Sequence, residues 1–517
     1  GAPLVSTTKH RFTRDDRVVK EQLVTSFREI VDKAFDETGD LTMRALEKKL
    51  WTWIVGIGAA LFTALLAQRC RDASLAEIAR LGVPAGRWFF RLDHGHQARL
   101  STTFGRLTFP LFAWRDLSSG KPKTRVPARQ LVLPLRGRCR SSELLLEFET
   151  RAGSMEAFRS AADTLGFYSH GAIDVEDTTI AAHAVKIGGL IDRSWLYRSV
   201  ENIREILADR ATTDRTGLPI VYCSTDACAL RRFVDETTAA AWKMANGIRV
   251  WCVDKFTGEL IHIGGEYTWG NCEVVEEAFK ALHALGVLPK DGDYGDGLKA
   301  RVATLVDGQP WILNRVVGWF DSPVSSLDPW HLLERLGTDI KAMVGPGNKV
   351  GTGFMKKATT ILLGGQAQEP KAPKPRAGRK NKRRSSPQEL PAGPCPKDTA
   401  AASLIALVAA LPCVSKEAKE VRTTLLAFLE DNKDRMAYRV LRWRGYMIGS
   451  GAMEALHPVG VQARLKLPGA RWLAETSGAL FNLRMMRLAG RWDEFWSRSD
   501  LNQYLDAAFP KPALEAV

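Results

Sequence analysis

The sequence predicts a multidomain α/β protein, and three observations lead to that fold class. Apolar runs of strand length alternate with amphipathic segments of helical period between residues 219 and 345, the pattern of a mixed sheet covered by helices. Helical segments and segments that alternate with a period of two precede this region. A stretch rich in Pro, Lys and Arg interrupts the chain after it. With 517 residues, the chain is long enough for several packed cores.

The order of the elements between 219 and 345 predicts how the sheet is connected. Eight segments follow one another as strand, strand, strand, helix, strand, helix, strand and helix: 218–226, 247–254, 259–268, 272–289, 300–308, 309–320, 322–328 and 329–345. Three consecutive strands form an antiparallel meander, and the strand–helix units that follow add parallel strands. This is the ribonuclease-H-like topology, which we expect for the core.

Changes in composition divide the whole chain into seven segments. We expect an N-terminal helical region at 1–100, a small β-rich module at 101–150, a helical segment at 151–218, the first part of the core at 219–345, an all-helical insertion at 346–434 with a disordered basic loop at 366–397, the second part of the core at 435–490 and a C-terminal tail at 491–517.

Two N-terminal segments bear on whether the chain contacts DNA or a membrane. The helical pattern around Gly188-Gly189 is that of a DNA-binding helix-turn-helix whose second helix begins near Asp192, or of an ordinary helical hairpin. The apolar run from Trp53 to Ala67 is too short to cross a bilayer, so we expect a buried helix and no membrane partner.

The charge distribution favours a polyanionic partner, nucleic acid first. The net charge is +15, and eight basic residues and no acid lie between Lys371 and Arg384. The segment from Arg435 to Arg491 has ten basic residues, two acids and several aromatic residues, so its charge belongs to a folded surface. The residues expected to contact the DNA backbone are Arg231, Arg232, Lys380, Arg383, Arg384, Arg442, Arg464, Lys466, Arg471, Arg484 and Arg487.

Two aspartates follow predicted strands that should be neighbours in the sheet. Asp226 ends the first strand and Asp307 the fourth, so their carboxylates are expected to converge. Two close carboxylates favour a cation between them, and Mg²⁺ is the natural one. Glu454 follows Gly449-Ser450-Gly451 near the start of a helix and is the expected third ligand. Each acid alone also fits a turn, a cap or a first-turn helix position.

A second pair of polar residues lies at another strand-to-helix junction. Asp328 precedes Pro329, so it is expected to cap the following helix with the proline at the first helical position. His331 would then lie near the same edge of the sheet. Either the two residues only support the structure, or they orient a metal ligand or a phosphate without binding the metal themselves.

Four ordered segments resemble a known family. They are "STDACALRRF", "TLVDGQPWILNRV", "SLDPWHLLERL" and "IGSGAMEALHPVGVQARLKLPGARWLAETSGALFNLR". Together they resemble the bacterial insertion-sequence DDE transposases of the Kra type, relatives of the Mutator and hAT groups. The likeness extends from Ile220 to Leu488 outside the insertion.

The resemblance implies a function, which we state as an expectation. It implies a DNA transposase that binds the terminal repeats of its element, cleaves there and transfers the strand, with Asp226, Asp307 and Glu454 as catalytic residues and metal ligands. It implies two Mg²⁺ ions, replaceable by Mn²⁺, double-stranded DNA as partner and a homodimer or larger assembly on DNA. A prokaryotic cytoplasm, at the nucleoid, is the implied location, and eight cysteines without a C-x-x-C pair fit a reducing compartment.

The sequence also departs from the family pattern. No cysteine-rich zinc ribbon precedes the core, Ala227 stands where glycine is common, and Pro458 should kink the helix that holds Glu454. Two alternatives therefore stay open. One is a domesticated DNA-binding protein with an inactive core, and the other is a ribonuclease-H-like nuclease without strand transfer.

Overall fold

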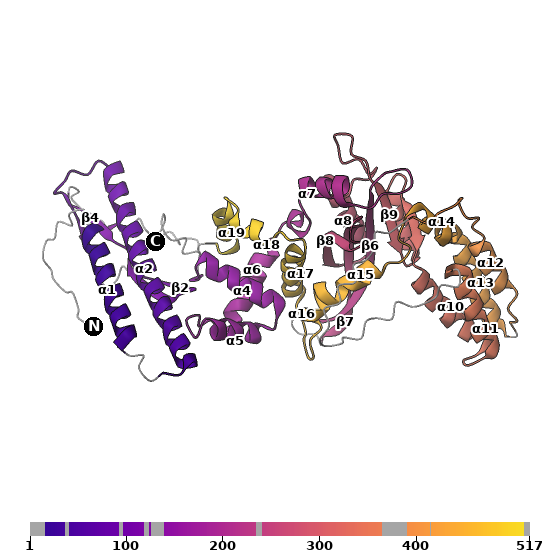
Figure 1. Ribbon diagram of the computed structural model, residues 1–517, viewed down its shortest axis with the longest axis horizontal. Coiled ribbons are helices and arrows are strands. Elements are labelled where there is room, and N and C mark those ends of the chain that lie inside the picture. Colours follow the sequence, from indigo (N-terminus) through magenta and orange to yellow (C-terminus); the bar gives the residue numbers. More distant parts are fainter. Residues whose placement is uncertain are drawn as a thin grey trace, which may run out of the picture. The chain divides into compact units, whose positions relative to one another are not determined.

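The computed structural model describes residues 16–36, 41–91, 97–117, 124–125, 139–233, 240–363, 390–413 and 415–510. The chain forms two compact units (Figure 1). Unit 1 comprises Gly1–Leu190 and Trp496–Val517, and unit 2 comprises Ile191–Phe495. The unit boundary falls inside the segment 151–218 that the composition groups together, and the finer sevenfold division stays a prediction.

Unit 1 consists of helices and two small sheets. Its elements are α1 (Asp16–Asp36), α2 (Met43–Arg80), β1 (Trp88–Arg91), β2 (Gln97–Thr102), β3 (Gly105–Pro110), β4 (Ala113–Asp116), β5 (Thr124–Arg125), α4 (Glu143–Met155), α5 (Phe158–Tyr168), α6 (Asp177–Gly189) and α19 (Leu501–Ala508), with α18 (Trp492–Ser497) across the unit boundary. β1, β4 and β5 form one sheet, and β2 and β3 form a hairpin. Strands are therefore present as expected for a β-rich module, but α4 begins inside its range because Ser142 caps the helix.

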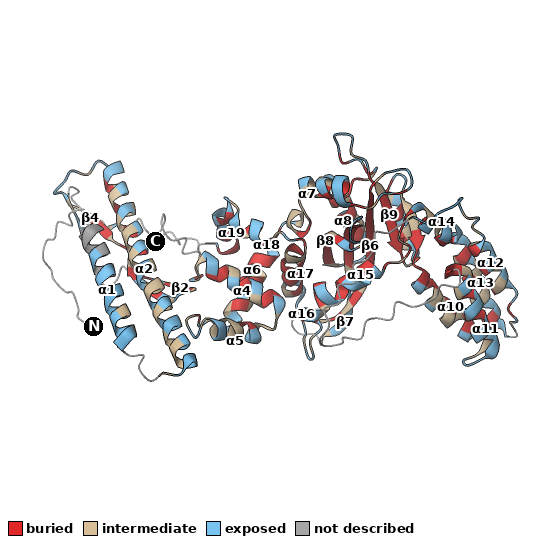
Figure 2. Ribbon diagram, viewed as in Figure 1, coloured by how far each residue is buried: buried red, intermediate tan, exposed pale blue. Residues whose placement is uncertain are grey.

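The apolar run from Trp53 to Ala67 lies inside α2, and the expectation that it is buried is wrong. Of the described helices, α2 is the one long and apolar enough to cross a membrane, yet only 6% of its most apolar window is buried. Ala59, Phe62 and Leu66 pack against the β2–β3 hairpin, whereas much of the rest is exposed (Figure 2).

The helix-turn-helix hypothesis fails at its second helix. Residues from Asp192 form three short elements instead, η1 (Arg193–Leu196), α7 (Val200–Glu205) and η2 (Ile206–Arg210). Tyr197 separates the first two, is fully buried and bridges to Gly264 of the sheet. A Cβ at Gly264 would lie 2.3 Å from the Tyr197 ring, so the segment is held against the sheet edge rather than presented as a helix.

Unit 2 is built on the expected five-stranded mixed sheet. The strands are β6 (Ile220–Arg232), β7 (Ala241–Val253), β8 (Leu260–Trp269), β9 (Arg301–Val306) and β10 (Val324–Leu327), in the order β10-β9-β6-β7-β8. β6, β7 and β8 pair antiparallel, and β9 and β10 add parallel strands. The helices α8 (Cys272–Ala284), α9 (Pro310–Arg315) and α10 (Pro329–Val344) connect and cover it, with the short turn η3 (Val317–Trp319) after α9. The topology is consistent with a ribonuclease-H-like core.

One strand is longer than the sequence indicated. β6 continues for six residues beyond Asp226, because residues 227–232 pair with the first residues of β7 in an extended hairpin. Asp226 is therefore not at the end of its strand. It lies where β9, the parallel neighbour of β6, has already ended at Val306.

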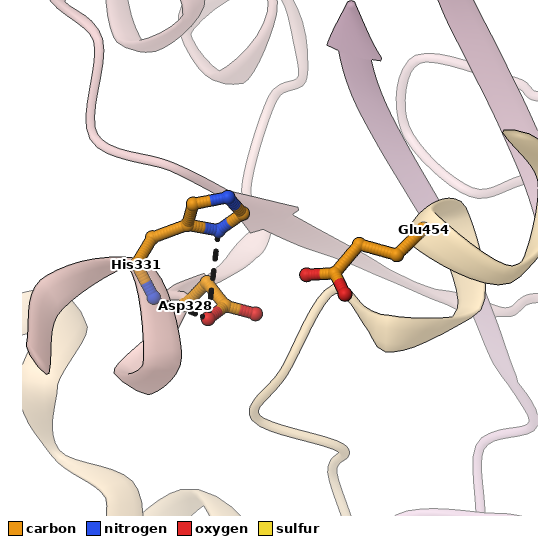
Figure 3. A group of neighbouring side chains, drawn as sticks. All are labelled: Asp328, His331 and Glu454. Atoms are coloured by element: carbon orange, nitrogen blue, oxygen red, sulfur yellow. Dashed lines mark hydrogen bonds and ion pairs between the residues drawn. The ribbon is translucent and has the colours of Figure 1, made fainter. Parts of the chain in front are cut away.

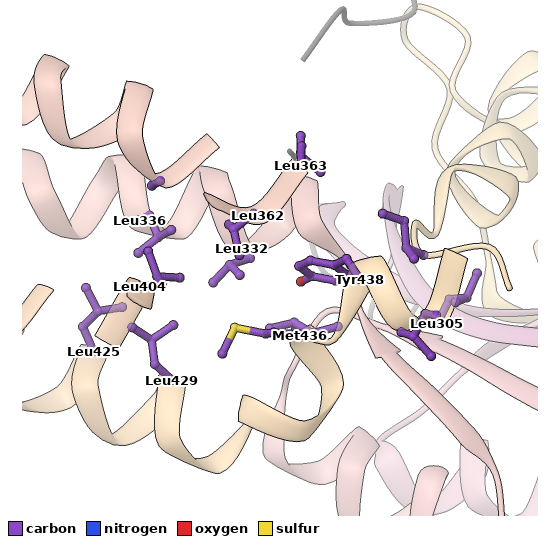
Figure 4. Close-up of a cluster of buried hydrophobic side chains, with 14 of the residues drawn as sticks. Leu305, Leu332, Leu336, Leu362, Leu363, Leu404, Leu425, Leu429, Met436 and Tyr438 are labelled. Carbon is purple, nitrogen blue, oxygen red and sulfur yellow. The ribbon is translucent and has the colours of Figure 1, made fainter. Parts of the chain in front are cut away.

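The helices of the insertion share one hydrophobic core with one face of the sheet. Its helices are α11 (Lys349–Leu363), α12 (Ala400–Ala409) and α13 (Lys416–Asp431), followed by η4 (Lys433–Met436). Leu332, Leu336 and Leu362 meet Leu404 and Leu429 in one buried cluster that continues to the sheet (Figure 4). Residues 364–389, most of the expected basic loop, lie outside the described residues.

The chain returns to the sheet after the insertion. The elements are α14 (Tyr438–Arg444), α15 (Gly451–Leu456), η5 (His457–Gln462), α16 (Ala463–Leu465) and α17 (Ala474–Leu488). Phe481 of α17 contacts Tyr267 and Trp269 of β8, with ring centroids 5.6 and 5.8 Å away. α17 thus packs against β8, and α15 lies against β6 and β7, where Met453 is beside Gly247.

Candidate metal centre

Asp226 of β6 lies level with Asp307 and Asp328, which directly follow the adjacent parallel strands β9 and β10. Ser224 pairs with Leu305, and Val306 pairs with Leu327. Two residues after the Ser224–Leu305 pair, this register places Asp226 level with Asp307. One residue after the Val306–Leu327 pair, it places Asp307 level with Asp328. The structure thus brings Asp226 and Asp307 to one edge of the sheet, as the sequence predicted, and adds Asp328 to them.

Asp328 is completely buried, and both of its oxygens are used by the protein. Oδ1 accepts hydrogen bonds from the backbone N–H groups of Trp330 and His331 at 2.7 and 3.0 Å. Oδ2 accepts from the N–H and the Oγ of Ser450 at 2.5 and 2.8 Å. Burial alone would raise the pKa of Asp328, but hydrogen bonds from His331 and Ser450 lower it to about 2. Asp328 thus caps α10, as expected, and also ties the segment before α15 to the sheet.

The glycine-serine-glycine step allows this close approach. A Cβ at Gly449 would lie 3.4 Å from Asp328 Oδ2 and close to Trp330. Anchored there, the chain enters α15 with Glu454 in its first turn. The ligand atoms of Asp328, His331 and Glu454 all lie within 4.8 Å of one another, and the Glu454 carboxylate points toward the other two (Figure 3).

Two buried guanidinium groups and one glycine hold the segment that contains Glu454. Arg249 of β7 donates to the carbonyl of Ala452, and Arg484 of α17 donates to the carbonyl of Gly460 at 2.7 Å and to that of Val459. Met453 packs over Gly247, where a Cβ would lie 2.5 Å from the Met453 Cε. The segment is therefore fixed at both ends against the sheet.

Pro458 changes the helix as expected. The α-helical pattern ends at Leu456, and His457–Gln462 forms a wider π-helical turn before α16. Arg484 contacts the carbonyls of this wider turn, which has lost the regular helical hydrogen bonds. The proline thus bends the segment without breaking its packing on the sheet.

His457 is a site residue that the sequence reasoning missed. Its Nε2 lies 3.0 Å from Asp226 Oδ2, and its Nδ1 lies 2.8 Å from the Tyr267 hydroxyl, which donates to it when Nε2 carries the proton. Burial works to raise the pKa of Asp226, but the hydrogen bonds from His457 and from the Ala227 N–H, together with the nearby histidine charges, outweigh it and the pKa is lowered. The available signal was position, since His457 is three residues after Glu454 and so on the same helix face.

The remaining groups show how charge is balanced at the edge. Burial raises the pKa of Asp307, and the charge of Asp226 adds to this, although Gln309 donates to both Asp307 oxygens. Asp328, whose Oδ1 lies 3.6 Å from His331 Nδ1, raises the pKa of His331 to about 9, helped by Asp226 and Asp307. His331 is therefore positively charged near neutral pH and partly offsets the carboxylates.

The donor set fits a hard divalent cation. Oxygen ligands from carboxylates are those that Mg²⁺ prefers. Within the described residues, no hydrogen bond or ion pair occupies the exposed Glu454 carboxylate, and burial raises the pKa of Asp307 despite the nearby His331 and Gln309, so a cation beside Asp307 would stabilise its charged form. Asp328 accepts four hydrogen bonds, two on each oxygen, whereas each oxygen of Asp226 and Asp307 accepts one from the described residues. Asp226, Asp307 and Glu454 therefore keep oxygen lone pairs for such an ion. Neither Asp226 nor Asp307 belongs to the described group within 4.8 Å.

Two of the arginines expected to contact DNA are interior residues. Arg464 is 1% exposed and lies over the Trp472 ring, and Arg484 is 3% exposed and holds the backbone near Pro458. A buried guanidinium that contacts protein is not available to phosphate, so we correct both expectations. Their sequence spacing among exposed basic residues gave no sign of this.

The other expected DNA contacts differ in exposure. Arg442, Lys466 and Arg471 are exposed, whereas Arg231, Arg232 and Arg487 are half-buried. The Arg232 guanidinium lies over the Trp269 ring at 4.9 Å. Lys380, Arg383 and Arg384 lie outside the described residues.

The chain matches no family model and no curated protein. Among solved structures it is similar to the Drosophila P element transposase strand transfer complex, with 11% sequence identity and a TM-score of 0.23 over 69% of this chain and 81% of that chain. No function is inferred from a likeness of this size.

Proposed function

We propose that the chain is a transposase-like enzyme of the DDE class that cleaves and joins DNA, with Asp226, Asp307 and Glu454 as its catalytic carboxylates. The observation that supports this most is the register of three adjacent parallel strands, which places Asp226 level with the aspartates that follow β9 and β10. Glu454 is added to the same edge by the bond between Asp328 and Ser450. A ribonuclease-H-like sheet with acids at this edge is a suitable scaffold for phosphodiester chemistry.

The protein residues have separate roles in this proposal. Mg²⁺, when bound, supplies an activated water or 3′-hydroxyl and stabilises the leaving oxygen. His457 fixes the orientation of the Asp226 carboxylate, and Asp328 fixes the position of Glu454 through the loop before α15. His331 places a positive charge beside the carboxylates, where a DNA phosphate would be bound.

The reaction would take place in two displacements. Water attacks a phosphorus at the element end, a P–O bond to the new oxygen forms, and the bond to the 3′-oxygen breaks. That 3′-hydroxyl then attacks a phosphodiester of the target, which forms one P–O bond as another breaks. Exposed Arg442, Lys466 and Arg471 would bind the DNA backbone. Two ends must be held at once, which favours a dimer or a larger assembly.

One observation favours a second candidate, a DNA-binding protein whose core no longer cuts. The described group within 4.8 Å contains Glu454 but neither Asp226 nor Asp307. If binding of DNA and metal does not draw the three acids together, the chain would bind DNA through its basic surface and leave it intact.

The test uses labelled DNA that carries the two sequences bordering the gene, with Mg²⁺ or Mn²⁺. We expect strand cleavage that disappears in Asp226→Asn and Glu454→Gln, while Glu475→Gln, an exposed acid outside the site, retains it. Pre-cleaved 3′-hydroxyl ends should be joined to plasmid DNA; cleavage without joining would favour the nuclease alternative. DNA binding with equal product from wild type and both site variants would refute the assignment of these acids.

A further inference from the structure

The β6–β7 hairpin projects beyond the packed part of the core and exposes two large apolar side chains. The first four residues of β7 are exposed, whereas those after them are almost all buried. Among these four, Trp242 is 59% exposed and Met244 is 52% exposed. They are two residues apart on one strand, so both side chains lie on the same face of the hairpin, beside Arg231 and Ala229 of β6. Trp242 and Met244 thus form an exposed apolar pair.

The other face of the same hairpin is already packed against this chain. Cys228 and Leu230 of β6 point to that face and are buried. Gln462 donates to the Cys228 Sγ at 3.5 Å, and Trp472 forms a parallel bridge to the end of β6. The segment that contains Gln462 and Trp472 therefore holds the hairpin in place, while the face with the apolar pair stays exposed.

The apolar pair lies on the same two strands as the Asp226 carboxylate. Met244 pairs with the third residue beyond Asp226, and Trp242 pairs with the fifth. At about 3.4 Å per residue, the pair is roughly 10 to 17 Å along the hairpin from Asp226. A duplex rises about 3.4 Å per base pair, so this distance corresponds to about three to five base pairs. DNA whose scissile phosphate lies at the carboxylates is therefore long enough to contact the apolar pair.

Cations accompany the apolar pair. The Lys466 amine lies 5.8 Å from the centroid of the Trp242 ring, and Lys243, between the two apolar residues in sequence, is exposed. The described residues of the projecting part of the hairpin include three basic residues and no acid, while Asp235 and Glu236 at its tip lie outside the described residues. Cations beside an aromatic face are the features with which proteins bind single-stranded DNA, because the cations contact phosphates and the ring stacks on bases.

The apolar character of the pair specifies which part of DNA it would contact. Phosphates are charged, whereas the faces of the bases are apolar, and in a duplex those faces are covered by the neighbouring bases. They become available where a segment of the DNA is unpaired. We propose, on the basis of the function proposed above, that Trp242 and Met244 bind unpaired bases about three to five nucleotides from the scissile phosphate, with Lys466 on an adjoining phosphate.

The test compares the affinity of the full-length chain for two DNA probes with the sequence bordering the gene. One probe is fully paired, and the other is unpaired at the predicted position and has 2-aminopurine there. Binding is measured by fluorescence anisotropy in EDTA, so that no strand is cut. Wild type should bind the unpaired probe about 5- to 100-fold more tightly and quench its 2-aminopurine. Trp242→Ala should abolish both effects, and Trp242→Phe should keep most of each.

Three controls separate stacking from charge and position. Phe256 is 63% exposed at the opposite end of β7, with the Lys255 amine 5.1 Å from its ring centroid, so Phe256→Ala should keep the preference for the unpaired probe. Lys466→Gln should weaken binding of both probes by a similar factor and reduce the salt dependence. An unpaired segment placed about one helical turn further away should bind wild type no better than paired DNA.

The outcomes distinguish this contact from the catalytic assignment. Equal affinity of wild type for both probes, or an unchanged preference in Trp242→Ala, would overturn the contact proposed for the apolar pair. Neither result would affect the proposed function, which is tested by cleavage and joining in Mg²⁺. A wild type that binds neither probe would overturn both proposals.

Discussion

Two aspartates that lie side by side in the sheet should respond oppositely to the same substitution. Asp328→Asn removes a carboxylate that accepts four hydrogen bonds, two of them at the N-terminus of α10. Asp307→Asn removes a carboxylate whose burial raises its pKa. We therefore expect Asp328→Asn to lower the free energy of unfolding and Asp307→Asn to leave it unchanged or raise it.

The magnitude for Asp328 follows from its pKa. The pKa is lowered from 3.8 to about 2, and at about 1.4 kcal/mol per unit this contributes roughly 2.5 kcal/mol to stability at neutral pH. Because the folded pKa is depressed, this contribution is present above pH ~4 and is lost as the pH falls through about 2. The amide NH₂ of the asparagine would also face N–H and O–H groups that are donors themselves. The cost of Asp328→Asn should therefore reach about 3 kcal/mol.

The assay is urea unfolding at pH 7 with EDTA, followed by tryptophan fluorescence, for wild type and both variants. Both variants should lose DNA cleavage, Asp307→Asn through the missing carboxylate and Asp328→Asn because Glu454 is no longer held in place. Added Mg²⁺ should stabilise wild type but not Asp307→Asn. Equal losses of stability in the two variants, or none in Asp328→Asn, would refute the division between a structural and a functional aspartate.

Three further measurements test other parts of the structure. His457→Ala should lower the affinity for Mn²⁺ about 10- to 100-fold in calorimetric titration, since the Asp226 carboxylate loses the group that orients it, and an unchanged affinity would remove His457 from the site. Arg484→Met should destabilise the chain in urea by about 3 kcal/mol, because two carbonyls near Pro458 lose a charged donor; a loss under 1 kcal/mol would contradict that role. Burial works to lower the pKa of His183, but hydrogen bonds to Cys139 and Glu149 raise it to about 9. These contacts of His183 should therefore stabilise unit 1 by about 3 kcal/mol below pH ~6.5, and the contribution should be lost as the pH rises through about 9. Thermal melts should show this dependence in wild type and a smaller one in Glu149→Gln, which keeps the hydrogen bond between His183 and Cys139.

Local sequence patterns predicted the core well, because strands, turns and caps depend mainly on neighbouring residues. β-Branched runs and turn residues give each strand, and the order of strands and helices gives the ribonuclease-H-like connection. Asp328 before Pro329 also predicted the cap of α10, since capping depends only on neighbouring residues. The same reasoning failed at Asp192, where a helical pattern is overridden by the burial of Tyr197 against Gly264.

Contacts between distant residues decided the rest. The sequence by itself determined which acids stand near strand ends and that Pro458 disturbs the helix after Glu454. It did not show that Asp328 accepts hydrogen bonds from Ser450, that His457 contacts Asp226, or that Arg464 and Arg484 are buried. Register and burial bring together residues more than 100 positions apart, and only the folded chain brings these groups within hydrogen-bonding distance.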